Sequence, residues 1–559
     1  MAKVLRSTSS IKKMGIERIG SILLKNKSIT QDELDSCIKM QENSDVAEKL
    51  GVILRRYNFV SDEELARALA KQVGWRYFDK KYVVNLKRVE EIGLDYLRDK
   101  LIVPVETNQG EAVVFAYPFD TEISITPQEK EDSRVECFIG SQSDIRECLE
   151  ALINEKKIKE IKDKITQIKN EGLVGGNLKE LLDLLLDSAI IEQATDIHIE
   201  PEEKISAIRF RIDGILRFEI CLSVKLHNNL VNVVFNKAEI TVSDFLKFHD
   251  ARFQHVYAGN TVDIRVSSVP SIHGPSLVLR LLDANKTLIT LEKLGFQDSH
   301  FNSIRQVSET PHGIIIITGP TGSGKTTTLY AILNQLKGLK RKIITVEDPV
   351  EIKMPLINQV QINEKQGITF AHSTRAFLRH DPNIILIGEI RDTDTAQEAI
   401  RAAITGHKVL STLHTNDTVD AIYRLQDLGI SLEHIANSVL CLVSQRLLRK
   451  LCVHCRKRTV VKKEELPEFF KKCLKDNENE VHIYKPRGCS CCQQGYRGRT
   501  VIAEVLLFNE QIRSMISEDK LNLLREQIKK DGFVSLEMDA ARLVLEGVTS
   551  LEEAIRVAG

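Results

Sequence analysis

The 559-residue chain lacks several features that mark particular classes of protein. It has no apolar run near the roughly 20 residues that a bilayer-spanning helix needs. Residues 1–13 are polar and basic with no apolar region after them, so they do not resemble a secretory signal. The chain has 78 lysines and arginines and 78 aspartates and glutamates. It therefore carries no net positive charge that would favour binding to nucleic acid. These absences predict a cytoplasmic protein that neither spans a membrane nor binds nucleic acid.

The composition is otherwise ordinary for a globular protein, with 42% hydrophobic and 28% charged residues. A chain of this length is too long for one core, so we expect three or four domains. Its eleven cysteines are improbable as a disulfide framework in so large a chain. Seven of them we interpret as small buried hydrophobes or bystanders: Cys37, Cys137, Cys148, Cys221, Cys441, Cys473 and Cys491.

An internal repeat opens the chain. Two 24-residue blocks, 18–41 and 49–72, carry glycine, leucine, an aliphatic residue, leucine and glutamine at the same offsets. Thr30 and Ser61 are good helix N-caps with acidic residues just after them, so the blocks predict a duplicated helical module. The matched pairs are Gly20/Gly51, Leu23/Leu54, Ile29/Val60, Leu34/Leu65 and Gln41/Gln72.

The composition suggests further boundaries. A mixed stretch from Trp75, with short β-like runs such as Ala112-Val113-Val114-Phe115, completes an N-terminal domain at 1–150. Isoleucines at 158, 161, 165 and 168 predict a linker helix within 151–176, which we interpret as a solvated connector ended by glycines at 172, 175 and 176. Strand-like runs at 207–212, 263–266 and 277–282 then predict a middle domain of α+β type at 177–290.

The strongest motif follows an apolar strand at 313–317. Four isoleucines lead into G-x-x-x-x-G-K-T at 319–326, and a helix-like run follows at 327–336. This context is that of a phosphate-binding loop (P-loop), whose glycines let backbone N–H groups face phosphates at a helix N-terminus. Lys325 then reaches the β- and γ-phosphates of ATP, and the Thr326 hydroxyl coordinates Mg²⁺. The predicted nucleotide-binding residues are Gly319, Pro320, Thr321, Gly322, Ser323, Gly324, Lys325, Thr326 and Thr327.

Three more apolar strands end in polar side chains. The strands span 343–346, 384–387 and 409–413, and they end at Glu347, Glu389 and His414, respectively. Because ligands in parallel α/β sheets lie beyond the carboxyl ends of the strands, we expect these side chains to meet the P-loop at one edge. Such convergence favours an ATPase domain at 291–559 over a set of unrelated solvated loops.

Together these residues resemble the secretion ATPases of the GspE/PilB family, which drive type II secretion and type IV pilus assembly. The resemblance covers about 196–504. Two segments of the middle domain depart from it: Lys247-Phe-His-Asp-Ala-Arg252 lacks an expected proline and glycine, and Pro275 stands where the family often has glutamate. Beside the P-loop, the resemblance rests on Asp196-Ile-His-Ile-Glu-Pro201, Arg209-x-Arg-x-Asp-Gly214, Asp263-Ile-Arg-Val-Ser267, Val346-Glu-Asp-Pro-Val-Glu351, Leu378-Arg-His-Asp-Pro382, Ile387-Gly-Glu-Ile-Arg-Asp392 and Gly406-His-Lys-Val-Leu-Ser-Thr-Leu-His-Thr-Asn-Asp417.

The resemblance implies a multidomain α/β fold with a helical N-terminal domain, a PAS-like middle domain and a RecA-like ATPase domain. Phosphoryl transfer needs positioning and charge neutralisation, so we assign Glu389 to Mg²⁺ or its water shell and Glu347 to the attacking water. These two roles are interchangeable at this stage, and His414 would sense the γ-phosphate. The resemblance further implies that some of four middle-domain arginines approach the nucleotide when the domains close, and ordinary ion pairs are the alternative for each. The four are Arg209, Arg211, Arg265 and Arg280.

The two C-x-x-C pairs bound an insertion at 451–496. In a cytoplasmic chain they indicate a structural four-thiolate zinc site more strongly than a redox site. Cys491 competes with Cys492 for one position, and the C-x-x-C turn favours Cys492, whereas His454 is a bystander. Members of the family that act in assembly carry such an insertion. The predicted zinc ligands are Cys452, Cys455, Cys489 and Cys492.

The family implies a homo-hexamer that binds an inner-membrane platform protein and reaches the membrane through partners. A pilus retraction motor is an alternative, but retraction members lack the long N-terminal domain and the insertion. A nucleic-acid translocase is another, disfavoured by the neutral charge. The duplicated blocks resemble a cyclic-di-GMP-binding (MshE-type) module, although Lys49 replaces an arginine; the alternative is a helical adapter. The ligand residues would be Arg18, Gly20, Leu23, Gln41, Lys49, Gly51, Leu54 and Gln72, with Leu34 and Leu65 as further apolar contacts.

Overall fold

The fold is given by a computed structural model, and contacts divide the chain into two units, Met1–Glu192 and Gln193–Gly559. The predicted boundaries at 150, 176 and 290 stay predictions. In the described part of the chain, no helix has the length and apolar character to cross a membrane. The structure describes residues 17–42, 48–57, 59–79, 84–107, 110–117, 136–171, 177–241, 247–257, 259–283, 290–453, 455–471, 473–474, 479–489 and 492–559.

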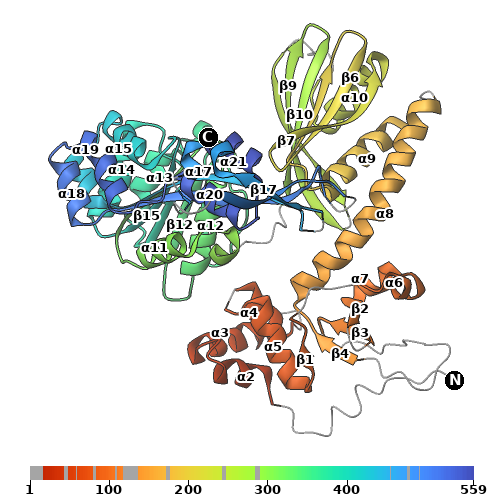
Figure 1. The fold of residues 1–559 in the computed structure, drawn as a ribbon, viewed down its shortest axis with the longest axis horizontal. Coiled ribbons are helices and arrows are strands. Elements are labelled where there is room, and N and C mark those ends of the chain that lie inside the picture. Colours follow the sequence, from red (N-terminus) through yellow and green to blue (C-terminus); the bar gives the residue numbers. More distant parts are fainter. Residues whose placement is uncertain are drawn as a thin grey trace. The chain divides into compact units, whose positions relative to one another are not determined.

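The repeated blocks form four helices, as the duplication predicted (Figure 1). Both predicted N-caps are confirmed. The Ser61 hydroxyl accepts a hydrogen bond from the Glu64 N–H, whose side chain accepts from Ser61 N–H in return. Thr30 and Glu33 make the same reciprocal pair of bonds. The helices are α2 (Ile19–Lys25), α3 (Gln31–Glu42), α4 (Leu50–Arg56) and α5 (Asp62–Val73).

The block glycines let one helix approach the next. A Cβ on Gly20 would lie 2.9 Å from Leu34 Cδ1, and a Cβ on Gly51 would lie 3.1 Å from Leu65 Cδ1. Both distances are tighter than an ordinary side-chain contact, so the repeated spacing of glycine and leucine suits close helix–helix contact. The repeat is therefore a packing motif in its own right.

The first unit is not purely helical: the domain expected to be helical also contains a sheet, and the predicted β-like run at 112–115 lies in it. A four-stranded mixed sheet of order β1-β4-β3-β2 lies beside the helices, because the run Ala112–Phe115 is almost fully buried and needs strand partners. Its elements are β1 (Arg76–Tyr77), α6 (Leu86–Ile92), α7 (Leu94–Lys100), β2 (Ile102–Thr107), β3 (Gly110–Phe115) and β4 (Glu136–Ile139).

Helix α8 (Gln142–Glu171) is longer than the predicted linker helix and is not a solvated connector. Ile161 and Ile165 are only 8% and 7% exposed, because the leucine-rich α9 (Asn177–Ile191) packs along it (Figure 1). The prediction failed because α9 supplies an apolar partner that lies outside the linker itself. The side chain of Ile168 and the glycines at 172, 175 and 176 lie outside the described residues.

The second unit begins with a six-stranded antiparallel sheet of order β7-β6-β5-β10-β9-β8. Alternating residues of β6 are buried, and α10 packs against this buried face (Figure 1). All three predicted strands lie within it. The elements are β5 (Asp196–Pro201), β6 (Ile205–Ile212), β7 (Ile215–Ser223), α10 (Val224–Lys237), β8 (His249–Tyr257), β9 (Asn260–Ser271) and β10 (Gly274–Asp283).

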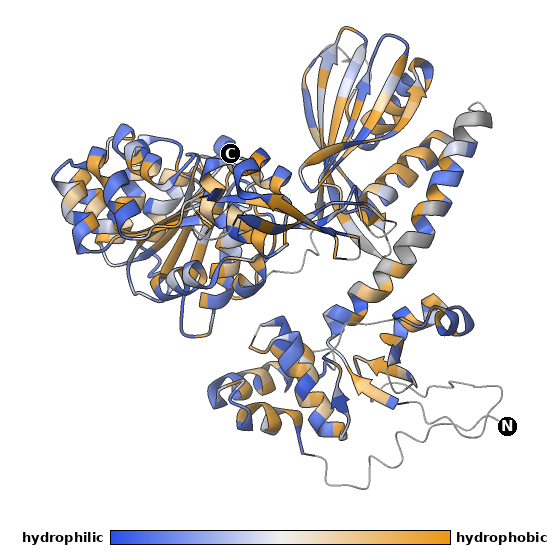
Figure 2. Ribbon diagram, viewed as in Figure 1, coloured by the Kyte–Doolittle hydropathy of each residue, from blue (hydrophilic) through white to orange (hydrophobic). Residues whose placement is uncertain are grey.

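A seven-stranded sheet of order β13-β12-β14-β15-β11-β16-β19 follows, parallel except for β19. All four predicted strands are confirmed, and their hydrophobic residues mark the centre of this sheet in Figure 2. The strands are β11 (Gly313–Thr318), β12 (Ile343–Glu347), β13 (Ile357–Gln361), β14 (Ile384–Ile387), β15 (Lys408–Leu413), β16 (Val439–Leu451) and β19 (Tyr496–Leu507).

Helices cover this sheet, and the cysteine-bearing insertion joins β16 to β19. The helices are η2 (Leu291–Leu294), α11 (Asp298–Ser308), α12 (Lys325–Leu336), η3 (Glu364–Gln366), α13 (Phe370–Phe377), α14 (Thr393–Ile404), α15 (Thr418–Asp427), α16 (Leu432–Ser438), α18 (Glu510–Ser517), α19 (Leu521–Lys530), α20 (Leu536–Leu545) and α21 (Leu551–Ala558). The insertion holds β17 (Lys457–Lys462), η4 (Lys463–Glu465), α17 (Glu468–Lys471) and β18 (Glu480–Lys485).

Candidate active site

The P-loop joins the central strand β11 to α12. Gly319, Gly322 and Gly324 have φ angles of 140°, 80° and 89°, a backbone region that favours glycine. A Cβ on Gly319 would lie 2.4 Å from the carbonyl oxygen of Gln445. The loop therefore curls against β16 and places backbone N–H groups at the start of α12, where phosphate binding is electrostatically favoured.

Lys325 is held inside this loop. Its ammonium group donates to the carbonyl oxygens of Gly319 (2.8 Å) and Pro320 (3.1 Å), and the residue is only 9% exposed. Burial lowers the pKa of Lys325, and the nearby Glu389 carboxylate opposes that shift. A buried cation at the start of a helix is suited to an anionic phosphate. Thr326 and Thr327 follow in the first turn of α12, half-buried and exposed respectively.

Glu389 and His414 meet at the same edge, as predicted. The His414 Nε2 atom lies 3.6 Å from a Glu389 carboxylate oxygen, and Arg391 pairs with the other oxygen. Burial lowers the pKa of His414, and the charges of Lys325 and Arg391 add to this shift while Glu389 opposes it. A neutral imidazole beside the P-loop lysine can donate a hydrogen bond to a phosphate without adding a second fixed charge.

Gly388 stands where such strands usually end in aspartate, and packing explains it. A Cβ there would lie 3.2 Å from the Val346 carbonyl oxygen and 3.3 Å from the Phe370 ring. Its N–H donates to the same Val346 oxygen at 2.8 Å. The close approach of β14 to β12 leaves little room for a side chain, and Glu389 is the first acid beyond this strand.

Glu347 lies at the end of β12 but in a different environment from Glu389. It is 3% exposed, and its oxygens accept hydrogen bonds from the Tyr330 and Thr345 hydroxyls and from the Gln359 amide at 3.2 Å. Burial and the Glu347 charge both raise the pKa of Tyr330, so that hydroxyl keeps its proton. Protein donors thus already surround the carboxylate to which we assigned the attacking water.

Sequence reasoning missed Gln445, which supports the P-loop from β16. Its side-chain N–H donates to the Ser323 carbonyl at 2.8 Å, and its side-chain oxygen accepts from the Thr328 hydroxyl at 2.9 Å. The residue is 1% exposed. A signal was present in the sequence: Ser444 and Gln445 are a polar pair that directly follows the apolar run at 439–443.

Comparison with known proteins agrees with this site. The family described as "Type II/IV secretion system protein" matches residues 174–556. The type II secretion system ATPase E of Vibrio cholerae is 42% identical over 379 residues, covering 68% of this chain and 75% of that protein. The chain belongs to the type II secretion ATPases. Its enzymatic activity is therefore ATP hydrolysis, as the P-loop predicted.

Two further likenesses describe how far the relationship extends. The type II secretion system protein E of Xanthomonas campestris pv. campestris is 32% identical over 562 residues, 97% of this chain and 98% of that protein, so this relative spans the N-terminal unit as well. The X-ray structure of the Legionella pneumophila ATPase DotB has a TM-score of 0.51 at 21% identity, covering 68% of this chain and 95% of that chain. The likeness to DotB shows that the two chains share a fold.

The middle-domain arginines of the ATPase lie on the sheet face opposite α10. One row of paired positions crosses the strands β6, β5, β10, β9 and β8. Along this row the residues are Arg211, Asp196, Arg280, Arg265 and Arg252. Asp196 pairs with two of them, with Arg280 at 3.0 Å and with Arg211 at 3.6 Å. Arg265 and Arg252 are exposed. Arg209 pairs instead with Glu200. Sequence reasoning missed Arg252, although it stands in the segment that departs from the family pattern.

The four predicted zinc ligands of the ATPase come together. Sulfur–sulfur distances are 3.8 Å for Cys452–Cys489 and 3.6 Å for both Cys455–Cys492 and Cys489–Cys492, and all four sulfurs lie within 4.8 Å of one another. Four thiolates about 2.3 Å from a tetrahedral zinc would be about 3.8 Å apart, whereas a disulfide needs about 2.05 Å. The donor set therefore fits zinc. Cys491 and His454 lie outside the described residues.

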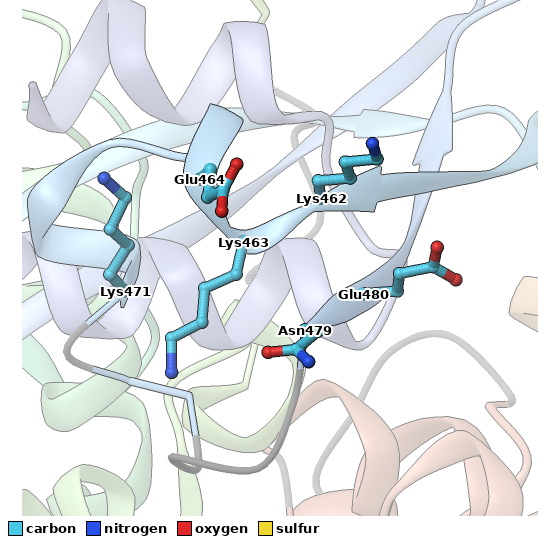
Figure 3. Close-up of a pocket in the computed structure, with 6 residues that line it drawn as sticks. All are labelled: Lys462, Lys463, Glu464, Lys471, Asn479 and Glu480. Atoms are coloured by element: carbon cyan, nitrogen blue, oxygen red, sulfur yellow. The ribbon is translucent and has the colours of Figure 1, made fainter.

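A hollow of about 520 Å³ lies on the insertion, and its lysine side chains do not converge on one point where an anion could bind. Its lysines Lys462 and Lys463 are consecutive, and Figure 3 shows their ammonium groups pointing in different directions. Lys471 pairs with Glu468 at 2.8 Å. None of the predicted site residues lines this hollow, which is bounded by Lys462, Lys463, Glu464, Lys471, Asn479 and Glu480.

The predicted ligand residues of the duplicated module divide into two sets. Leu23 and Leu54 are 0% exposed, which corrects their predicted role as ligand contacts: they are core residues. Gln72 donates to the Glu17 carbonyl at 3.0 Å, and Gln41 donates to the Glu48 carbonyl at 2.5 Å. Each closing glutamine therefore bonds the residue just before the opening of a block. Arg18 and Lys49 are exposed at the N-caps of α2 and α4.

Proposed function

We propose that this ATPase binds Mg–ATP at the P-loop and couples its hydrolysis to movement between its middle and ATPase domains, as the motor of a type II secretion system. The observation that carries the proposal is the convergence of Lys325, Glu389 and His414 at one edge of the seven-stranded sheet. Lys325 would neutralise the phosphates, and Thr326 with Glu389 would hold Mg²⁺. His414 would contact the γ-phosphate.

The attacking water needs a carboxylate to activate it. The sequence favoured Glu347 for this role, whereas the geometry favours Glu389. Glu389 faces His414, whereas Glu347 accepts three hydrogen bonds from protein groups. We therefore assign the activation of the attacking water to Glu389. Glu347 instead would hold Tyr330 and the segment after β12 in place. The two Glu→Gln substitutions, compared in the Discussion, test this assignment.

The motor would act as a ring of six subunits bound to an inner-membrane platform protein. A closed ring lets neighbouring subunits contact each nucleotide site, and the exposed Arg265 and Arg252 are suited to a phosphate. The test is hydrolysis by the purified chain with Mg²⁺ and with EDTA, together with sedimentation with and without nucleotide. Magnesium-dependent turnover by a nucleotide-stabilised hexamer is expected. Full turnover by a persistent monomer contradicts the ring.

The system served is tested in cells. We expect this chain to restore export in a host that lacks its own type II secretion ATPase, provided that the platform protein from the same source is present. Restoration of pilus assembly without export would assign the motor to the pilus branch of the family instead. The four-thiolate cluster would hold zinc and stabilise the insertion, with no open position for catalysis.

The duplicated module would bind cyclic-di-GMP through Arg18 and Lys49. These two exposed cations occupy equivalent positions of the two blocks and match the two phosphates of a two-fold ligand. Calorimetry on the full chain tests the proposal, with Arg18→Ala as the variant and Arg67→Ala, an exposed arginine of α5, as the control. Heat that only Arg18→Ala abolishes supports a ligand site, whereas no heat at high micromolar ligand leaves an adapter module.

A further inference from the structure

Strand β16 carries two adjacent polar residues in its fully buried part. Ser444 and Gln445 are 0% and 1% exposed; the buried Val443 precedes them and the half-buried Arg446 follows them on the strand. A buried polar group is costly unless it is hydrogen-bonded. Because neighbouring residues of a strand face opposite sides of the sheet, the two side chains reach different segments.

Gln445 reaches the P-loop. Its two bonds, to the Ser323 carbonyl and the Thr328 hydroxyl, bracket the start of α12, which contains Lys325. A Cβ on Gly324 would lie 3.2 Å from the Gln445 side-chain nitrogen. One carboxamide therefore fixes the position of the loop relative to the first turn of the helix.

Ser444 and its ladder partner Glu504 on β19 reach the segment that follows His414. The Ser444 hydroxyl donates to the Asn416 carbonyl at 3.1 Å. The Glu504 carboxylate accepts from the Thr418 N–H at 2.7 Å and from the Thr418 hydroxyl at 3.0 Å. These bonds fix the turn between β15 and α15, and His414 is at the start of that turn.

We propose that β16 and β19 form a brace that positions both phosphate-facing segments, with Gln445 as the positioning residue of the P-loop and Glu504 as that of the His414 turn. The inference rests on the proposed nucleotide site. Neither side chain touches the nucleotide: each acts through the segment that it holds.

The two residues should affect different kinetic constants. The P-loop holds the phosphates of both ADP and ATP, so loosening it weakens nucleotide binding. His414 would contact only the γ-phosphate, so loosening its turn lowers kcat and leaves ADP affinity unchanged. A purely structural role for either residue would change thermal stability without this split.

The first experiment measures Mg–ADP binding by calorimetry for Gln445 variants of the full chain. Gln445→Ala should raise the Kd about tenfold, because it leaves the Ser323 carbonyl and the Thr328 hydroxyl without partners. Gln445→Glu should raise it as well, because a carboxylate would face that carbonyl. Thr328→Val should weaken binding and Thr328→Ser should not, a matched pair at the same site. Wild-type affinity in both Gln445 variants overturns the role of Gln445.

The second experiment measures kcat and ADP affinity for Glu504 variants. Glu504→Ala should lower kcat about tenfold with ADP affinity within about twofold of wild type. Glu504→Gln keeps an acceptor for Thr418 and should restore most of kcat, and Glu510→Ala, an exposed glutamate beyond β19, is the control. Unchanged kcat, or a loss confined to ADP affinity, overturns the role of Glu504. If the wild-type chain itself binds no Mg–nucleotide, the proposed function fails instead.

Discussion

The phosphate-binding edge and the duplicated N-terminal module both carry glycines at fixed spacing, but for different physical reasons. In the P-loop, Gly319 and Gly324 have positive φ angles, which let the backbone turn around a phosphate. In the module, Gly20 and Gly51 lie within ordinary helices and make room for Leu34 and Leu65. A spaced glycine in a motif indicates either a ligand or a neighbouring helix, and only the backbone conformation distinguishes the two.

The leucines and charged residues continue this contrast. At the phosphate edge the motif's polar side chains face one another, and most of its apolar residues are strand core. In the module the repeated leucines are the core, and the cations are exposed. Substitutions in the first region should therefore change activity at nearly constant stability, whereas leucine substitutions in the second should change stability at nearly constant activity.

The largest expected effect is that of Lys325→Ala. Removing the cation that faces the phosphates should lower ATP turnover about 100-fold or more and leave the fold intact. Steady-state hydrolysis and the melting temperature measure the two quantities. Lys529→Ala, an exposed lysine of α19, is the control. Wild-type turnover by the Lys325 variant would remove the basis of the nucleotide site.

Glu389→Gln and Glu347→Gln form the next pair. Glu389→Gln should lower kcat about 100-fold while ATP still binds, because the amide cannot hold the metal shell or accept a proton. Glu347→Gln should slow turnover too, but its melting temperature should also fall, because the amide disturbs the bonds from Tyr330, Thr345 and Gln359. Equal melting temperatures with a deeper loss of kcat in Glu347→Gln would return the water-activating role to Glu347.

Leu23→Ala and Leu54→Ala test the module directly. Each removes a fully buried side chain and should lower the free energy of unfolding of its unit by about 2–5 kcal/mol. Denaturant unfolding monitored within the N-terminal unit measures this loss, and Leu86→Ala, an exposed leucine of α6, is the control. Near-zero loss in both variants would mean that the two leucines face a ligand space after all.

Cysteine substitution should separate stability from catalysis in the insertion. We expect about one zinc per chain by elemental analysis, and Cys489→Ser should lose that metal and lower the melting temperature. Cys473→Ser, outside the cluster, should keep the metal. Iron in place of zinc, or no metal in the wild-type protein, contradicts the assignment.

The smallest effect is a pH dependence that arises at Glu504. Burial raises its pKa to about 7, and the charges of Asp417 and Glu537 add to the rise while the bonds from Thr418 oppose it. The folded state then holds this proton more tightly than the unfolded state does, so stability is greatest below about pH 4.5 and falls as pH rises toward about 7. Glu504→Gln should flatten unfolding free energy over that window. An identical slope in the variant would refute the shift.

Four strands of the seven-stranded sheet and the polar residues at their ends were predictable from the chain itself. Short isoleucine-rich runs bounded by glycine or an acid favour buried strands by their length and β-branched residues, and the G-x-x-x-x-G-K-T sequence specifies its own turn chemistry. The thiolate spacing likewise predicted a cluster that the geometry supports. Helix caps at Thr30 and Ser61 needed no tertiary information, because capping bonds are local.

Only the tertiary structure decided which side chains from distant parts of the sequence contact one another. Ile161 and Ile165 of α8 are buried because α9 lies against them, and Gln445 is a P-loop residue because β16 pairs with β11. Two acids at the ends of adjacent strands differ in role because Tyr330, Thr345 and Gln359 surround only Glu347. The amino-acid sequence by itself determined the capped helices of the repeat, the strands that end at the phosphate edge and the turn of the P-loop, since those depend on neighbours along the chain. The contacts between them depend on packing, which no local pattern encodes.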